Sequence, residues 1–215
     1  MTPRRLVLLR HGQTAWNKAL RVQGQIDADL DDTGRAQAEA VAPVLATLDP
    51  TLLWSSDLAR ARDTASYVEK AAGLAASYDA RLRETHLGER QGLTHDEYAA
   101  LDPVEFAQFR QGHYDAVPGA ERTAAVRDRM VAAVTDLRRA LAPGETGIAV
   151  SHGAAIRVAV GGLLGWPADQ YRSLRGLGNC GWVVLVERPG SDGLALEAYN
   201  RAVPTPDFTS ATSVG

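Results

Sequence analysis

The sequence predicts an α/β protein, built as a three-layer α/β/α sandwich with a mostly parallel central sheet. Short apolar runs alternate with segments of helical periodicity, and strands that alternate with helices form a sheet covered on both faces. Two of these runs, residues 6–9 and 146–150, are followed closely by a histidine and a glycine. A length of 215 residues suits one domain with a single core.

Six segments have the composition of strands. Residues 6–9 form an uninterrupted apolar run near the N-terminus, which is typical of a buried central strand. The expected strands are residues 6–9, 51–55, 75–78, 146–150, 182–186 and 194–199. Because helical segments separate most of them, most neighbouring strands are expected to run parallel.

Capping residues mark the expected helix starts. Asp31 or Asp32 can cap a helix that Pro43 is expected to kink or to end early, because proline removes an internal hydrogen bond. Three more helices are expected to begin at Asp57, at residues 94–97 and at residues 102–105, and the last two starts have capping-box spacing. A further long helix is expected at residues 121–141.

Composition limits the classes of function. One domain, residues 1–203, is expected to be followed by a flexible polar tail, residues 204–215. A formal net charge of −3 gives no basic field, so no nucleic-acid partner is expected. Apolar stretches stay short of the roughly 18 residues that span a membrane. Cys180 is the only cysteine and is expected to be a small buried hydrophobe, and no secretory-signal pattern opens the chain, so a cytoplasmic location is expected.

Several familiar motifs occur in the wrong context. Residues 176–181 match G-x-G-x-x-G, but they precede an expected strand, whereas a dinucleotide-binding loop follows a strand and opens a helix. The aspartates at 27, 29 and 31 resemble a calcium loop without its glycine and closing glutamate, and are better explained as a turn and a helix cap. Neither a cofactor nor a metal is therefore expected.

Charged side chains gather where strands are expected to end. Arg10 and His11 follow the first strand, and His152 follows the strand at 146–150, so both histidines are expected at the edge where open α/β sheets bind ligands. Arg60 lies at a helix start and Glu84 in a loop. Taken alone, Arg10 and His11 could be ordinary loop residues, and Glu84 a surface carboxylate paired with Arg83.

Together these residues favour phosphate chemistry. Guanidinium groups match the oxygens of a tetrahedral oxyanion, and an imidazole whose second nitrogen is held by a backbone acceptor can attack phosphorus. A carboxylic acid, which Glu84 could supply, would protonate a departing alkoxide.

Five ordered motifs resemble the histidine phosphatase superfamily, the phosphoglycerate mutase-like proteins. They are LRHGQTAWN at 9–17, QG at 23–24 with LDDTGRAQA at 30–38, SSDLARARDTA at 55–65, RETHLG at 83–88 and VSHG at 150–153. The resemblance implies a phosphoglycerate mutase-like fold and a metal-independent reaction. The implied roles are His11 as the nucleophile that becomes phosphohistidine, Arg10, Arg60 and His152 as the phosphate pocket, Glu84 as proton donor, and Asn17, Gln23 and the Gly153 amide as further phosphate contacts.

The resemblance also has limits. Residues 118–122 read PGAER where many members carry PGGES, so no role is transferred to that loop. Residues 83–88 and 91–95 resemble actinobacterial phosphatases acting on glucosyl-3-phosphoglycerate, which makes that metabolite a candidate substrate. Leaving-group contacts are expected between residues 92 and 120 and in the tail. Homodimers are common in the superfamily, so a homodimer is a candidate assembly.

Three functions remain open at this point. The favoured one is a metal-independent phosphomonoesterase acting on a small phosphorylated metabolite. The first alternative is a phosphoglycerate mutase that depends on 2,3-bisphosphoglycerate, but the segment before the second histidine motif is acidic rather than basic, which favours hydrolysis. The second alternative, a catalytically silent phosphate-binding module, would have no need of Glu84.

Overall fold

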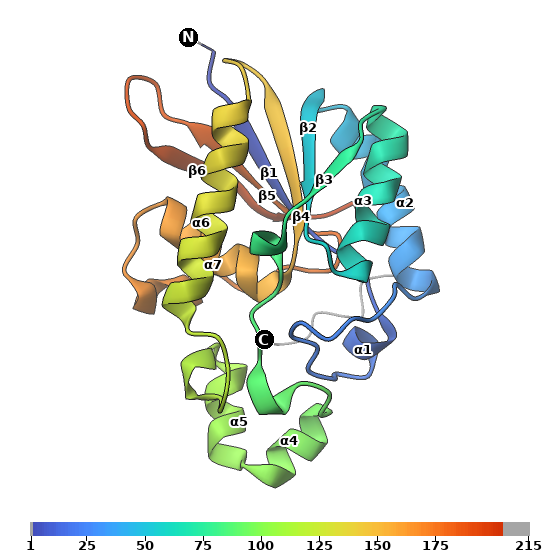
Figure 1. Ribbon diagram of the computed structural model, residues 1–215, viewed down its shortest axis with the longest axis vertical. Coiled ribbons are helices and arrows are strands. Elements are labelled where there is room, and N and C mark those ends of the chain that lie inside the picture. Colours follow the sequence, from blue (N-terminus) through green and yellow to red (C-terminus); the bar gives the residue numbers. More distant parts are fainter. Residues whose placement is uncertain (1, 204–215) are drawn as a thin grey trace.

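The computed structural model describes residues 2–203, and the expected tail at 204–215 lies outside the described residues. A six-stranded mixed sheet in the order β3-β2-β4-β1-β5-β6 forms its centre (Figure 1). The strands are β1 (Arg5–Arg10), β2 (Pro50–Ser55), β3 (Ala76–Tyr78), β4 (Thr146–Ser151), β5 (Trp182–Glu187) and β6 (Leu194–Arg201). β3, β2, β4 and β1 pair in parallel, whereas β5 runs antiparallel to both β1 and β6.

Helices cover both faces of this sheet. On one face lie α2 (Asp32–Ala46) and α3 (Ala59–Ala72), and on the other lie α6 (Thr123–Ala140) and α7 (Gly153–Leu163) (Figure 1). Successive residues of β1 point to opposite faces, so Leu6 and Leu8 pack in the cluster with α6 and α7, while Val7 and Leu9 pack in the cluster with α2 and α3. This double burial explains the uninterrupted apolar run, and the three-layer fold is confirmed.

A smaller helical lobe lies beyond the carboxyl ends of β1 and β4 (Figure 1). It contains α4 (His95–Leu101) and α5 (Pro103–Arg110), around a small apolar cluster of Val22, Leu87 and Tyr98. Thr94 forms the expected capping box with Glu97, and Asp102 caps α5. The remaining short helical segments are α1 (Ala15–Lys18) and four 3₁₀ turns at Ala80–Leu82, Gly88–Arg90, Tyr114–Ala116 and Ala168–Ser173.

An early end of α2 at Pro43 and a cap of α3 by Asp57 were both wrong expectations, whereas the alternative of a kink at Pro43 stays a prediction. Helix α2 does not end at Pro43 but continues to Ala46, because proline loses only its own donor and its carbonyl still accepts from Thr47 N–H at 3.3 Å. Asp57 does not cap α3, since its carboxylate binds Arg83; the carboxylate of Asp27, distant in sequence, accepts from Ala59 N–H at 2.7 Å instead. None of the helices within residues 2–203 is both long and apolar enough to cross a membrane.

Candidate active site

The parallel pairing of β1 and β4 brings the two histidines together. Arg10 faces Ser151 in the register, and the next residue of each chain segment is a histidine. The amide of His11 donates to the Ser151 carbonyl at 3.0 Å, and the ring centroids of His11 and His152 are 5.1 Å apart. Both side chains are buried.

Hydrogen-bond partners define which ring nitrogens carry protons. Nδ1 of His11 lies 2.7 Å from the Gly12 carbonyl oxygen, which can only accept, so Nδ1 is protonated and Nε2 of the neutral ring keeps its lone pair. Nδ1 of His152 accepts from Nε of Arg60 at 3.2 Å, so Nε2 of the neutral His152 ring donates to Ser56 Oγ at 2.9 Å. His11 therefore has a lone pair free for attack.

Burial and neighbouring cations favour the neutral imidazoles. Desolvation, reinforced by the charges of Arg60 and Arg10, holds the pKa of His11 well below its usual range, against the opposing effect of the Gly12 hydrogen bond. The pKa of His152 is also well below the usual range, first because of burial and then because of Arg60, His11 and Arg10. A neutral ring is the form that can act as a nucleophile.

The two arginines are rigidly held. Arg60 is almost fully buried, and besides the bond to His152 it donates to the carbonyls of Ile26 at 3.0 Å and Gly24 at 2.7 Å. Burial lowers the pKa of Arg60 to about 10. The guanidinium of Arg10 donates to the Leu177 carbonyl, while its buried Nε has no hydrogen-bond partner among residues 2–203. Buried cationic donors of this kind suit an anionic ligand.

Glu84 reaches the start of α7. Its Oε1 accepts from the amides of Thr85 at 2.8 Å and Ala155 at 2.9 Å, and its Oε2 accepts from Ala154 at 3.1 Å. Arg83 pairs with Asp57 and not with this carboxylate, so the alternative of a Glu84–Arg83 surface pair is wrong.

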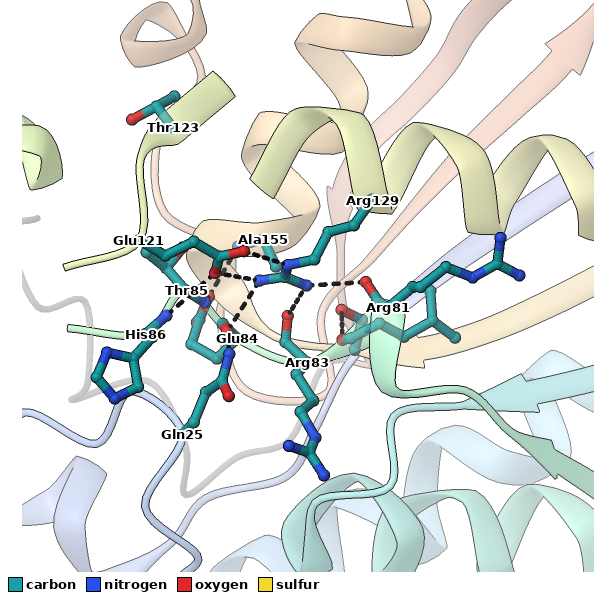
Figure 2. Close-up of polar contacts among 12 residues, drawn as sticks. Gln25, Arg81, Arg83, Glu84, Thr85, His86, Glu121, Thr123, Arg129 and Ala155 are labelled. Carbon is teal, nitrogen blue, oxygen red and sulfur yellow. Dashed lines mark hydrogen bonds and ion pairs between the residues drawn. The ribbon is translucent and has the colours of Figure 1, made fainter. Parts of the chain in front are cut away.

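An arginine that the sequence reasoning missed holds the loop of Glu84 (Figure 2). Arg129 on α6 donates to the carboxylate of Glu121 at 2.7 and 2.8 Å. The same guanidinium donates to three backbone carbonyls, those of Arg81 at 2.8 Å, Arg83 at 2.6 Å and Glu84 at 3.0 Å. No local signal in the sequence connects α6 with residues 81–84.

A pocket of about 230 Å³ joins the expected site residues. Arg10, His11, Asn17, Gln23, Arg60, Glu84 and Gly153 all line it. His152 is fully buried and is absent from this lining. Asn179, which the sequence reasoning also missed, donates to Oδ1 of Asn17 at 3.3 Å. Within residues 2–203 no group of three or more histidine, cysteine or acidic side chains could hold a metal ion.

Residues 6–201 match the model of the histidine phosphatase superfamily (branch 1), and the chain belongs to that superfamily. A glucosyl-3-phosphoglycerate phosphatase from Mycolicibacterium vanbaalenii is 43% identical over 199 residues, which cover 90% of this chain and 88% of the relative. A probable phosphoglycerate mutase from Photorhabdus laumondii is 37% identical over 178 residues, covering 80% of each chain.

Solved structures agree with this family assignment. A mycobacterial glucosyl-3-phosphoglycerate phosphatase in complex with VO₃ superposes with a TM-score of 0.84 at 37% identity, over 93% of this chain and 100% of that chain. The expected fold and the expected phosphatase class are thereby confirmed, and the mutase alternative has weaker support because the similarity to the named mutase is lower.

Proposed function

We propose that this protein is a metal-independent phosphomonoesterase that acts through a phosphohistidine at His11. The observation that carries the proposal is the neutral His11 ring. Its Nδ1–H is bound to the Gly12 carbonyl, which leaves the Nε2 lone pair available in a pocket lined by the buried Arg60 and the half-buried Arg10. Arginine charge beside the nucleophile would stabilise the three equatorial phosphoryl oxygens in the transition state.

The first displacement transfers the phosphoryl group to the enzyme. Nε2 of His11 forms a bond to phosphorus as the bond from phosphorus to the ester oxygen breaks, and Glu84 gives its proton to the departing oxygen. Oε2 of Glu84 would carry this proton, because it accepts only the longer bond, from Ala154. In the second displacement, water attacks phosphorus, Glu84 takes the water proton, and the bond between phosphorus and His11 breaks.

The remaining site residues would bind the phosphoryl group. Arg10 and Arg60 supply charge from the pocket lining, and His152 lies buried behind this lining, next to His11 and bound to Nε of Arg60. Asn17, Gln23 and the Gly153 amide would add hydrogen bonds, since all three residues line the same pocket.

The substrate proposed is a small phosphorylated metabolite, with glucosyl-3-phosphoglycerate as the first candidate. Support comes from the similarity to the curated phosphatase and the solved mycobacterial structure that bear this substrate in their names. The homodimer and the cytoplasmic location stay predictions, which light scattering and fractionation of the native cells would test.

Phosphate release in the presence of EDTA tests the proposal. The panel contains p-nitrophenyl phosphate, 3-phosphoglycerate and glucosyl-3-phosphoglycerate, and wild type is compared with His11→Ala. Loss of the nucleophile should lower kcat by about a thousandfold or more, and rapid acid-free quenching should trap label from ³²P-substrate on wild type alone. Conversion of 3-phosphoglycerate to its 2-isomer with added 2,3-bisphosphoglycerate, without phosphate release, would identify a mutase. Inactivity in both assays would indicate a binding module.

A further inference from the structure

A second and larger pocket adjoins the candidate active site. It encloses about 600 Å³ between the segment that joins α5 to α6 on one side and the middle of α7 with the 3₁₀ turn at Ala168–Ser173 on the other. The two pockets share two lining residues, Tyr114 and Arg157. A molecule whose phosphate lies beside His11 can therefore extend past these two side chains into the larger space.

Arg157 lies at this junction, and the described part of the chain gives it no acidic partner. Its Nη2 donates to the Tyr114 hydroxyl at 3.1 Å, and its guanidinium carbon lies 5.6 Å from the centre of the Tyr114 ring. Across residues 2–203 Arg157 forms no ion pair, whereas Arg90 and Arg129 are bound by Glu105 and Glu121. Within residues 2–203 the other four of its five N–H groups form no hydrogen bond, so they can bind a ligand.

The backbone opposite Arg157 makes room for the guanidinium. A Cβ on Gly112 would lie 2.5 Å from Nη2 of Arg157, and Gly112 has a φ of +83°, which other residues rarely adopt. A side chain here would push the guanidinium away from the junction. The glycine thus keeps Arg157 at the mouth that joins the two pockets.

We propose that Arg157 is a specificity-determining residue that binds a carboxylate of the leaving group, and that the larger pocket receives the rest of that group. A planar carboxylate matches the fork of one guanidinium. A second phosphate fits less well, because beyond Arg157 the larger pocket offers one arginine, Arg172, against two aspartates, Asp115 and Asp169. The proposal rests on the proposed phosphatase activity and names a substrate class, phosphomonoesters of hydroxy acids.

Two substrates that differ only near the carboxylate test the proposal. In 3-phosphoglycerate a carboxylate occupies the place of the free CH₂OH group of glycerol 3-phosphate. Wild type should prefer 3-phosphoglycerate, and Arg157→Gln should reduce the ratio of the two kcat/KM values by about 10- to 100-fold, mainly through KM, because a charge-assisted contact is lost. Arg157→Lys should recover part of the ratio, since it keeps the charge without the fork.

Control variants separate this contact from general effects. Arg127→Gln removes the same charge from a residue outside both pockets and should keep the wild-type ratio. Tyr114→Phe, which removes the hydroxyl bound to Arg157, should lower the ratio by a smaller factor. Hydrolysis of p-nitrophenyl phosphate reports on folding and on the phosphate pocket in each variant.

The outcomes are distinct. Equal kcat/KM values of wild type for the two substrates, or an unchanged ratio in an Arg157→Gln protein that still hydrolyses p-nitrophenyl phosphate, would overturn the carboxylate contact and leave the phosphatase proposal standing. Should Arg157→Gln fail to fold, the ratio in Tyr114→Phe and Arg157→Lys decides, and a wild-type ratio in both would overturn the proposal. Absence of any phosphate release from wild type would refute both proposals together.

Discussion

Replacement of Arg129 by glutamine should separate the stability of the fold from the placement of Glu84. The guanidinium makes five hydrogen bonds, two to Glu121 and three to the backbone of residues 81–84 (Figure 2). Removal of one partner from a buried ion pair costs about 3 to 5 kcal/mol. The side chains of Arg129 and Glu121 keep exposures of 17% and 20%, so water can solvate part of what is left, and we expect a loss of about 3 kcal/mol.

The catalytic effect should depend on the leaving group. A displacement of about 1 Å in a catalytic group can lower the rate by about a hundredfold. Because an alkoxide must be protonated as it leaves, Arg129→Gln should lower kcat for 3-phosphoglycerate by about that factor, and kcat for p-nitrophenyl phosphate, whose phenolate needs little assistance, much less. Arg129→Lys should recover only part of the rate, since it cannot bridge the carboxylate and the carbonyls together.

Arg81→Gln is the matched control. Arg81 lies in the same segment, but its side chain is 39% exposed and pairs with Asp79 and Asp136, so its loss should cost less than about 1 kcal/mol and leave the leaving-group dependence as in wild type. Urea unfolding and steady-state kinetics at 25 °C measure both effects. If Arg129→Gln is destabilised yet loses the same factor on both substrates, the interpretation of Arg129 as a positioning residue for Glu84 is wrong.

The pH dependence of this pair gives a further check. Burial alone would raise the pKa of Glu121, but the hydrogen bonds and charge of Arg129, with the backbone bond from His86, hold it below its usual range. A lowered pKa in the folded state contributes stability above the unfolded carboxyl pKa, about 4.3, which is lost as the pH falls through the folded value. The stability difference between wild type and Arg129→Gln should therefore shrink below about pH 4.

Three other predictions concern His11, Gly34 and Cys180, each a residue buried in the fold. The pKa of His11 is lowered in the folded protein, so the unfolded chain binds a proton more readily, and the free energy of unfolding should fall as the pH drops below about 6.5. Urea unfolding at several pH values should show that this free energy depends less steeply on pH in His11→Ala than in wild type. An equal dependence in the two proteins would contradict the prediction. A Cβ on Gly34 would lie 2.0 Å from the Gln13 carbonyl oxygen, so Gly34→Ala should lower the free energy of unfolding by about 1 to 3 kcal/mol. Thermal unfolding measures this loss, and an unchanged midpoint would disprove the close contact. Burial raises the pKa of Cys180 to about 12, so Ellman's reagent should react with it only on unfolding, and rapid labelling of the native protein would show that the thiol is accessible.

Local sequence patterns were sufficient for the strands and for the placement of both histidines at one edge of the sheet. The apolar runs at 6–9 and 146–150 predict strands buried on both faces, and parallel strands of this kind end at one edge. His11 and His152 follow those strands directly, but the contact between them depends on the pairing of β1 with β4, which are far apart in the chain. The capping box at Thr94 is equally local, because its partners are three residues apart.

Other features depended on contacts between residues distant in the sequence. Arg129 binds the loop of Glu84 across more than 40 positions, Asp27 caps a helix that begins 32 residues later, and Arg157 meets Tyr114 only because α7 packs beside the segment before α6. The sequence does not identify the residue with which an arginine or an aspartate pairs, since many arrangements can satisfy the charge of such a side chain. The sequence by itself therefore determined the strands, the phosphate-binding side chains and the family, whereas only the tertiary structure decided how the acid is held and where a leaving group can extend.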